Sequence, residues 1–255
     1  MNTNFQLIIL AAGKGSRLKS YTKKKPKSLI QFGKESILLH QIRIINLFDN
    51  IKKKILVAGY RSSEFKKISV NKIVINKEYK TSNMVWSLYK VRKFLNCNTI
   101  IAYGDIIYHK EILKKILLNK SNISLAIDKN FKSYWKKRFK NPFSDLETLK
   151  IKNGKIIEIG KKTSSYNDID GQYIGLIKLS LKGCSIFKSL FSFNNKYLSK
   201  NELKKISFTE FLEKIIELGY IVKPVLFKEP WIEIDTINDL KNKINHQRLN
   251  KIFRH

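Results

Sequence analysis

Short apolar runs alternate with amphipathic segments along the first half of the chain. The runs have about the length of a buried strand, and the segments between them repeat apolar positions at helical spacing. The predicted strands are residues 5–12, 54–59, 72–76 and 99–103. The predicted helices are residues 36–48, a segment from about 62, 82–95 and 110–118. This alternation is typical of β-α-β crossovers and of a parallel sheet covered by helices on both faces.

The alternation changes after about residue 120, where strands begin to follow one another directly. Asn153-Gly154 lies between two of these strands, and this dipeptide is a strong signal for a hairpin turn. The predicted strands are residues 121–128, 146–151, 155–159, 173–179, 220–227 and 231–234. The predicted helices are residues 181–190, 208–218 and a terminal segment from about 237. We therefore expect an α/β fold with a mixed, mainly parallel central sheet and a small antiparallel extension.

The length and composition of the chain indicate one domain. No internal repeat or low-complexity linker divides the 255 residues. We expect residues 1–255 to form this domain, with one half over about 5–128, a second half over about 129–240 and a C-terminal helix at 241–255.

Several features predict a cytoplasmic protein. The apolar runs are too short to cross a membrane, and the N-terminus lacks the basic segment, apolar stretch and cleavage site of a secretion signal. Cys97 and Cys184 form no CxxC pair, which argues against a disulfide framework or a zinc site. The sequence specifies no oligomeric state and is compatible with a homodimer.

Basic residues greatly outnumber acidic ones. Lys and Arg total 51 and Asp and Glu total 20, which gives a formal net charge of +31. Such an excess is compatible with nucleic-acid binding. However, it is mostly lysine spread along the whole chain, as AT-rich codons would produce, and arginine, the preferred residue for base readout, is scarce. We therefore expect an anionic small-molecule substrate rather than a nucleic acid.

The segment from residue 7 to residue 30 is the most informative about chemistry. It reads LIILAAGKGSRLKSYTKKKPKSLI, a buried strand that opens into a glycine-rich loop. Its small, flexible and positively charged positions are Ala11, Ala12, Gly13, Gly15, Arg17 and Lys27. Glycines let the backbone approach a ligand closely, and consecutive loop N–H groups can bind an anion. The segment therefore indicates a triphosphate site.

Two other phosphate-binding motifs do not fit this segment. A dinucleotide fingerprint needs a third glycine where Leu18 stands, and the Gly-Lys followed by Ser or Thr of a P-loop is absent. An ordinary glycine-rich turn is the remaining alternative, but such a turn does not require the nearby Arg17, Pro26 and Lys27.

The same segment resembles the signature of the nucleotidyltransferase family that includes sugar-1-phosphate nucleotidylyltransferases and phosphocholine cytidylyltransferases. The family pattern is approximately AAGxGxRLxPLTxxxPKxL, and Ser20-Tyr21 stands here where the family has Pro-Leu. The matching residues are Ala11, Ala12, Gly13, Gly15, Arg17, Leu18, Thr22, Pro26, Lys27 and Leu29.

The resemblance implies a Rossmann-like nucleotidyltransferase fold with a nucleotide-binding first half and an acceptor-binding second half. It implies catalytic roles for Arg17 and Lys27, which would stabilise the pyrophosphate leaving group. The residues expected to bind the triphosphate are Ala11, Ala12, Gly13, Gly15, Arg17 and Lys27.

Two aspartates at predicted strand ends are candidate magnesium ligands. Asp105 and Gly104 follow the strand predicted over 99–103, and Asp235 follows the strand predicted over 231–234. Carboxylates at the carboxyl ends of strands suit Mg²⁺, although either could instead cap the N-terminus of a helix. The resemblance implies that both hold one Mg²⁺ at the α-phosphate, with Gly104 beside the nucleotide.

The segment 82–88 can be read as part of a core helix. It is also similar to the NNxxSL segment of phosphocholine-type cytidylyltransferases, which implies that Asn83 contacts the nucleotide. The residues expected to bind the acceptor are Trp86, Lys161, Tyr173, Gly175 and Trp231, each of which is also compatible with a core or surface position. The three aromatic members, with Tyr103, could form a cage around an ammonium group.

Together these expectations describe a Mg²⁺-dependent cytidylyltransferase. It would transfer CMP from CTP to phosphocholine, 2-aminoethylphosphonate or a related acceptor and release pyrophosphate. A sugar-1-phosphate nucleotidylyltransferase using UTP or dTTP is the nearest alternative, and a basic nucleic-acid-binding protein without catalysis is an alternative of another class. A metal-dependent glycosyltransferase would use the acid pair Asp168-x-Asp170, which we interpret as a solvated turn.

Overall fold

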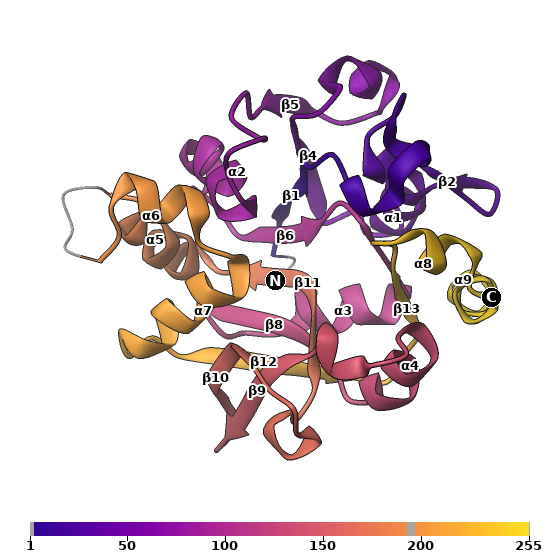
Figure 1. The fold of residues 1–255 in the computed structure, drawn as a ribbon. Helices are drawn as coiled ribbons and strands as arrows, with labels where there is room; N and C mark the ends of the chain where they lie inside the picture. Colours follow the sequence, from indigo (N-terminus) through magenta and orange to yellow (C-terminus); the bar gives the residue numbers. More distant parts are fainter. Residues whose placement is uncertain (1–2, 193–196, 255) are drawn as a thin grey trace.

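The computed structural model describes residues 3–192 and 197–254, and a nine-stranded mixed sheet runs through its centre (Figure 1). Across the sheet, the strands are β5 (Lys72–Ile75), β4 (Ile51–Ala58), β1 (Phe5–Ala11), β6 (Thr99–Tyr103), β11 (Gln172–Leu179), β8 (Ile123–Asp128), β12 (Val222–Phe227), β10 (Lys155–Lys162) and β9 (Glu147–Lys152). The first four are parallel. β11 is antiparallel to β6 and β8, and β10 to β12 and β9. The predicted α/β fold is confirmed.

β1 is buried on both sides of the sheet. All seven of its residues are buried, as expected for a parallel strand covered by helices on both faces. Leu7 and Ile9 belong to one apolar core, whereas Ile8 and Leu10 belong to the other, because side chains alternate across a strand. Burying each such side chain contributes about 1.5–3 kcal/mol. β1 therefore provides a rigid start for the loop that follows it.

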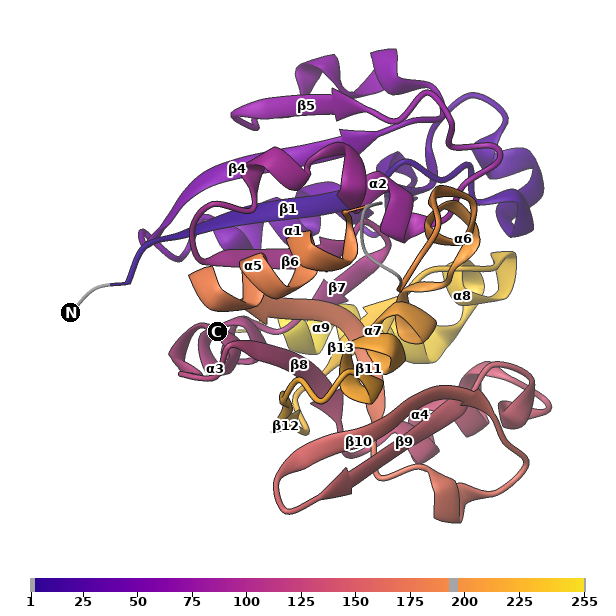
Figure 2. The same ribbon diagram turned by 90° about the vertical axis from the view of Figure 1, so that its left-hand side faces the viewer.

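Helices cover the two faces of the sheet (Figures 1 and 2). The helices on one face are α1 (Ile37–Ile45), α3 (Lys110–Leu118), α4 (Phe131–Arg138), α8 (Ile237–Lys241) and α9 (Lys243–Ile252). The helices on the other face are α2 (Met84–Lys90), α5 (Leu181–Leu190), α6 (Lys200–Lys205) and α7 (Phe208–Glu217). None of the described helices has the length and apolar character needed to span a membrane.

Two short antiparallel ribbons lie outside the large sheet. β7 (Ile106–Tyr108) pairs with β13 (Trp231–Glu233), and β2 (Gln31–Phe32) pairs with β3 (Glu35–Ser36). β7 follows β6 after a two-residue turn, so the first ribbon connects the centre of the sheet to the C-terminal part of the chain. Segments far apart in the sequence therefore meet at the end of β6.

Several predicted helices differ in length or type. The helix expected from about residue 62 is a 3-10 helix, and the helix expected over 82–95 ends at Lys90. The terminal helix is two helices, because Asn242 ends α8 and its side chain caps α9. The 3-10 helices are Ser16–Thr22, Lys27–Leu29, Ser62–Lys67, Arg92–Phe94, Pro142–Ser144 and Tyr166–Asp168.

Two helices, α4 and α6, and three short strands, β2, β3 and β7, were not predicted. α4 reads FKSYWKKR, in which aromatic and basic residues give only a weak apolar period, and its burial depends on contacts with distant parts of the chain. β7 is only three residues long and is defined by its pairing with β13. The Asn153-Gly154 hairpin is present, with φ of 51° and 66° at these two residues. β11 lies between β6 and β8, so both predicted halves contribute to one sheet, and we interpret the described residues as one domain.

Candidate active site

Two glycines allow the loop after β1 to pack closely against its neighbours. Gly15 has a left-handed backbone (φ 72°, ψ 51°), and a Cβ atom there would lie 2.7 Å from Cβ of Lys27. A Cβ atom on Gly104 would lie 2.8 Å from Cβ of Ala11. A larger residue at either position would therefore displace Lys27 or the end of β1.

A cavity of about 380 Å³ lies at the carboxyl ends of β1 and β6, where ligands bind in open α/β sheets. It is lined by Leu10, Ala11, Ala12, Gly13, Gly15, Ser16, Arg17, Lys27, Ser28, Tyr79, Ser82, Asn83, Met84, Ser87, Gly104, Asp105 and Asp235. The structure thus brings together every residue predicted to bind nucleotide or metal. What each of them binds remains a prediction.

Lys27 lies between the two predicted metal ligands. Its Nζ atom is 2.7 Å from Oδ2 of Asp105 and 2.6 Å from Oδ1 of Asp235, and Arg17 also pairs with Asp235. Burial alone would lower the pKa of Lys27, but the two carboxylates outweigh it and raise that pKa above the ordinary lysine value. At neutral pH the lysine is therefore a cation held between two anions.

The β7–β13 ribbon holds the two aspartates side by side. Glu233 pairs with Ile106, and the backbone N–H of Ile234 donates to the carbonyl oxygen of Asp105 over 3.0 Å. Asp105 precedes β7 and Asp235 follows β13, so an antiparallel pairing places both at the same end of the ribbon. Neither aspartate caps a helix with its own side chain, since Thr236 caps α8.

The two aspartates fit a divalent cation that prefers oxygen ligands. Oδ1 of Asp105 is buried and has no hydrogen-bond partner among the described residues. No group of three or more His, Cys, Asp or Glu side chains suited to a metal occurs in the described part of the chain. The pair of Asp105 and Asp235 would suit Mg²⁺, which commonly takes one or two carboxylates and completes its coordination with water and substrate phosphates.

The sequence analysis assigned no role to five polar residues of the cavity, Ser16, Ser28, Tyr79, Ser82 and Ser87. The hydroxyl group of Ser28 is buried and unpartnered among the described residues, next to Lys27. Tyr79 follows β5, and its position after the carboxyl end of a parallel strand was the available signal. Asn83 lines the cavity while its side-chain amide donates to the carbonyl oxygen of Lys205.

The predicted acceptor residues are not among those that line the cavity. Trp86 is buried, stacks on Tyr89 with ring centroids 4.5 Å apart, and donates its indole N–H to Glu78 over 2.9 Å. Trp231 is buried against Tyr134, with centroids 5.8 Å apart. These two residues have different neighbours, so the four aromatic side chains do not form the expected cage.

The other three acceptor candidates lie in the second half of the sheet. Tyr173 contacts Tyr103 edge-on, with ring centroids 5.9 Å apart. Gly175 has a φ of 80° and packs against the same ring, since a Cβ atom there would lie 2.4 Å from Cδ2 of Tyr103. Lys161 lies on β10, where it pairs with Glu158 at 2.8 Å and with Glu213 at 3.3 Å. A role in acceptor binding remains a prediction for all five candidates.

Asp145 and Glu233 are two further carboxylates near Asp235. Burial raises the pKa of Asp145 and of Glu147 above the ordinary values. Burial also raises the pKa of Glu233 to about 7, against the opposing effect of Arg138, and neighbouring carboxylates add to the rise.

The acid pair of the glycosyltransferase alternative has partners within its own region. Asp168 pairs with Lys150 at 3.2 Å and accepts a hydrogen bond from Thr163 over 2.9 Å. Asp170 accepts a hydrogen bond from the backbone N–H of Ile151 over 2.6 Å. Neither residue lines the cavity that contains Asp105 and Asp235.

Comparison with known proteins supports the same family. Residues 6–137 match the family model described as Nucleotidyl transferase. The chain is 35% identical to the CTP:phosphoglutamine cytidylyltransferase of Campylobacter jejuni over 250 residues, which cover 93% of this chain and 98% of that protein.

Two solved structures share the fold at lower identity. The inositol-1-phosphate CTP transferase from T. maritima superposes with a TM-score of 0.75 at 20% identity, covering 99% of this chain and 97% of that one. The CTP:phosphocholine cytidylyltransferase from Streptococcus pneumoniae gives a TM-score of 0.69 at 20% identity, covering 96% and 99%. With its glycine-rich loop and paired aspartates in one cavity, the chain belongs to the nucleotidyl transferase family.

Proposed function

We propose that this protein is a Mg²⁺-dependent cytidylyltransferase that transfers CMP from CTP to a small phosphorylated or phosphonate acceptor. The observation that carries the proposal is the grouping of Lys27, Asp105 and Asp235 beside the glycine-rich loop of one cavity. CTP is favoured because the 35%-identical relative and the two solved structures are all named for its use.

In the proposed reaction, an acceptor oxygen attacks the α-phosphorus of CTP in line. A new phosphorus–oxygen bond forms, the bond from the α-phosphorus to the bridging oxygen of the β-phosphate breaks, and pyrophosphate leaves with that oxygen. The attacking oxygen of a phosphate or phosphonate is already anionic near neutral pH, so no general base is needed. Rate acceleration then depends on alignment and on neutralising negative charge.

The residues of the cavity are suited to that task. The backbone N–H groups of the loop containing Gly13 and Gly15 would bind the triphosphate, and Arg17 and Lys27 would neutralise charge on the pyrophosphate. Asp105 and Asp235 would hold Mg²⁺, which supplies further positive charge to the phosphate oxygens when bound. Asn83, Tyr79 and Met84 line the part of the cavity next to α2, where we place the nucleoside.

We propose that the acceptor also carries a cationic nitrogen. The acceptors for which two relatives are named, phosphoglutamine and phosphocholine, support this proposal. Phosphoglutamine, phosphocholine and 2-aminoethylphosphonate all have such a group. Phosphoglutamine is the first acceptor to test, because the relative from Campylobacter jejuni is named for it.

The test is pyrophosphate release with Mg²⁺, each of CTP, UTP, GTP, ATP and dTTP, and each acceptor, with glucose-1-phosphate for comparison. We expect release with CTP and an ammonium-bearing acceptor, and its loss in Asp105→Asn. Asp168→Asn is the matched control, because this carboxylate lies outside the cavity lining. Release only with UTP or dTTP and the sugar phosphate would overturn the substrate proposal, and no release with any pair would count against catalysis.

A further inference from the structure

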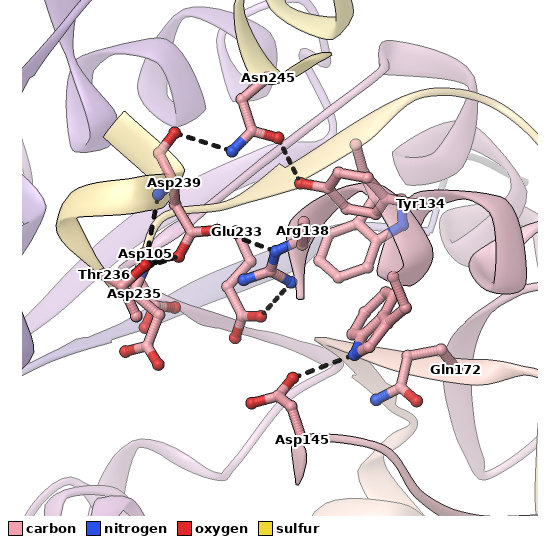
Figure 3. A network of polar contacts seen from close by, with 12 residues as sticks. Asp105, Tyr134, Arg138, Asp145, Gln172, Glu233, Asp235, Thr236, Asp239 and Asn245 are labelled. Atoms are coloured by element: carbon pink, nitrogen blue, oxygen red, sulfur yellow. Dashed lines mark hydrogen bonds and ion pairs between the residues drawn. The ribbon is translucent and has the colours of Figure 1, made fainter. Parts of the chain in front are cut away.

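Arg138, the last residue of α4, is a buried cation that does not line the cavity. Its side chain is 0% exposed, and it donates from Nη1 to Glu233 over 2.9 Å and from Nε to Asp239 over 3.0 Å (Figure 3). Burying a guanidinium group is unfavourable unless its partners compensate for the lost water. Its two carboxylate partners lie on either side of Asp235 in the sequence.

Asp239 transmits this contact to the backbone at Asp235. Its Oδ1 atom accepts from Arg138, while its Oδ2 atom accepts from the backbone N–H groups of Asp235 over 3.1 Å and Thr236 over 2.8 Å. The hydroxyl group of Thr236 donates to the same oxygen over 2.9 Å. One carboxylate therefore joins the guanidinium group to the peptide that carries Asp235.

Glu233 fixes the other side of the same segment. It pairs with Ile106 in the β7–β13 ribbon and accepts from Arg138 through its side chain. Arg138 thus fixes the chain on both sides of Asp235, at Glu233 and at Asp239. The β7–β13 ribbon fixes the backbone of Asp105 beside this segment. Figure 3 shows Arg138 between Glu233 and Asp239, with Asp105 and Asp235 close by.

Charge gives a second reason for a cation at this place. Glu233, Asp235 and Asp239 lie within seven residues of one another. Without Arg138, mutual repulsion would favour a separation of these carboxylates. A neutral residue of similar volume could fill the space but could not offset that repulsion.

We propose that Arg138 is a positioning residue that sets Asp235 opposite Asp105, so that the two carboxylates can bind a divalent cation together. It acts through Glu233 and Asp239 and contacts neither nucleotide nor acceptor. The inference rests on the proposed function, because it assigns Asp105 and Asp235 to the metal.

Arg248 offers a matched control on α9. Arg138 and Arg248 both lie over the Tyr134 ring, with guanidinium carbons 5.3 Å and 3.7 Å from its centroid. Arg248 also donates to the carbonyl oxygen of Trp231 over 3.0 Å. It thus supports the same region without an ion pair to a carboxylate among the described residues. Arg248→Met should lower stability without changing the spacing of the two aspartates.

The experiment measures binding of Mn²⁺ alone to the full-length protein by electron paramagnetic resonance, together with kcat and KM for CTP. We expect Arg138→Met to weaken Mn²⁺ binding by about 10- to 100-fold, as for other residues that hold metal ligands in place. Arg138→Lys should recover only part of the affinity, because one ammonium group cannot reproduce the guanidinium's two directed contacts. Arg248→Met should bind Mn²⁺ like the wild type.

Unchanged Mn²⁺ affinity in folded Arg138→Met, or an equal loss in Arg248→Met, would overturn the inference. If Arg138→Met does not fold, Asp239→Asn takes its place and should weaken Mn²⁺ binding in the same direction. Wild-type protein that binds no Mn²⁺ would also overturn it. Wild-type protein that binds Mn²⁺ but turns over no CTP would contradict the proposed function alone, since the metal-binding comparison would still stand.

Discussion

Asp105 and Asp235 contact the same lysine but are held in place by different chemistry. The turn that carries Asp105 is fixed by a neutral amide, since Nε2 of Gln41 on α1 donates to the carbonyl oxygens of Tyr103 over 2.7 Å and Ile106 over 2.5 Å. The segment that carries Asp235 is fixed by the ion pairs of Arg138. Both supporting side chains are buried and lie outside the cavity lining.

The difference follows from the local density of negative charge. The turn after β6 contains one carboxylate, and two hydrogen bonds from a neutral group are sufficient to fix its backbone. The segment from Glu233 to Asp239 contains three carboxylates within seven residues, and only a cation can both fix its backbone and offset their repulsion. The two sides of one site can therefore be tested separately.

The largest effects are expected from the aspartates themselves. Asp105→Asn and Asp235→Asn keep the shape of the side chain but remove the negative charge, and each should lower kcat by about 100- to 1000-fold. Pyrophosphate release with CTP measures the effect, and thermal unfolding tests whether each variant is folded. Near wild-type kcat in either variant would show that the two carboxylates do not act as a pair.

A slightly smaller effect is expected from Lys27, which links the two sides. Lys27→Met should lower kcat by about 100-fold, because it removes a charge from the pyrophosphate site. It also leaves two carboxylates without their shared cation, which should lower the free energy of unfolding by roughly 3 kcal/mol. Thermal unfolding with and without Mg²⁺ is the measurement, and added Mg²⁺ should recover more stability in the variant than in the wild type.

The pKa of Lys27 determines how its contribution to the free energy of unfolding depends on pH. The carboxylates raise this pKa in the folded protein. The stabilisation is therefore fully present below the unfolded-state value of about 10.4 and is lost as pH rises through the raised folded-state value. If the wild type lost its stability advantage over Lys27→Met between neutral and mildly alkaline pH, the raised pKa of Lys27 would be contradicted.

Loss of Gln41 should have a smaller effect than loss of Arg138. Gln41→Leu leaves two buried carbonyl groups without the amide, which should lower the free energy of unfolding by about 1–3 kcal/mol. Mn²⁺ affinity should fall by about 10-fold, at the lower end of the range for residues that support metal ligands. Gln41→Glu keeps the shape without the two N–H donors and should behave like Gln41→Leu. If Gln41→Leu weakened Mn²⁺ binding more than Arg138→Met does, Gln41 would be the more important support of the two aspartates.

The smallest effect is expected at Asp128, a buried carboxylate beside β13 and outside the cavity lining. It accepts the indole N–H of Trp231 over 2.9 Å, and burial raises its pKa. The folded protein therefore binds this proton more tightly than the unfolded chain, so stability falls as pH rises from about 3.9 through the raised value. Asp128→Asn should remove that fall and leave Mn²⁺ affinity unchanged, as measured by denaturant unfolding at several pH values.

The sequence was most informative where the functional residues are contiguous or follow a strand. The loop from Ala11 to Lys27 could be predicted because its glycines and charges occur together in one segment. Asp105 and Asp235 could be singled out because each follows an apolar strand, although the antiparallel β7–β13 ribbon is what brings them together. The mixed sheet and the hairpin at Asn153-Gly154 followed from periodicity and turn chemistry.

The predicted acceptor residues show where this reasoning is weak. Trp86 and Trp231 are large aromatic residues near informative segments, yet both are buried with neighbours of their own. Gln41 gave no signal because it is an ordinary polar residue in a predicted helix, and Arg138 gave none because α4 itself was not predicted. Their partners come from positions far along the chain, such as Asp239 and Tyr103.

Taken by itself, the sequence indicated most of the strands and helices in their order, the glycine-rich loop after β1 and the two aspartates. Local periodicity, turn preference and short motifs carry that information, because they depend on residues close together in the chain. Tertiary structure alone decided that Lys27 lies between Asp105 and Asp235, and that Arg138 holds one of them. Those contacts depend on the β7–β13 ribbon and on the packing of α4 against it, which join segments that no local pattern relates.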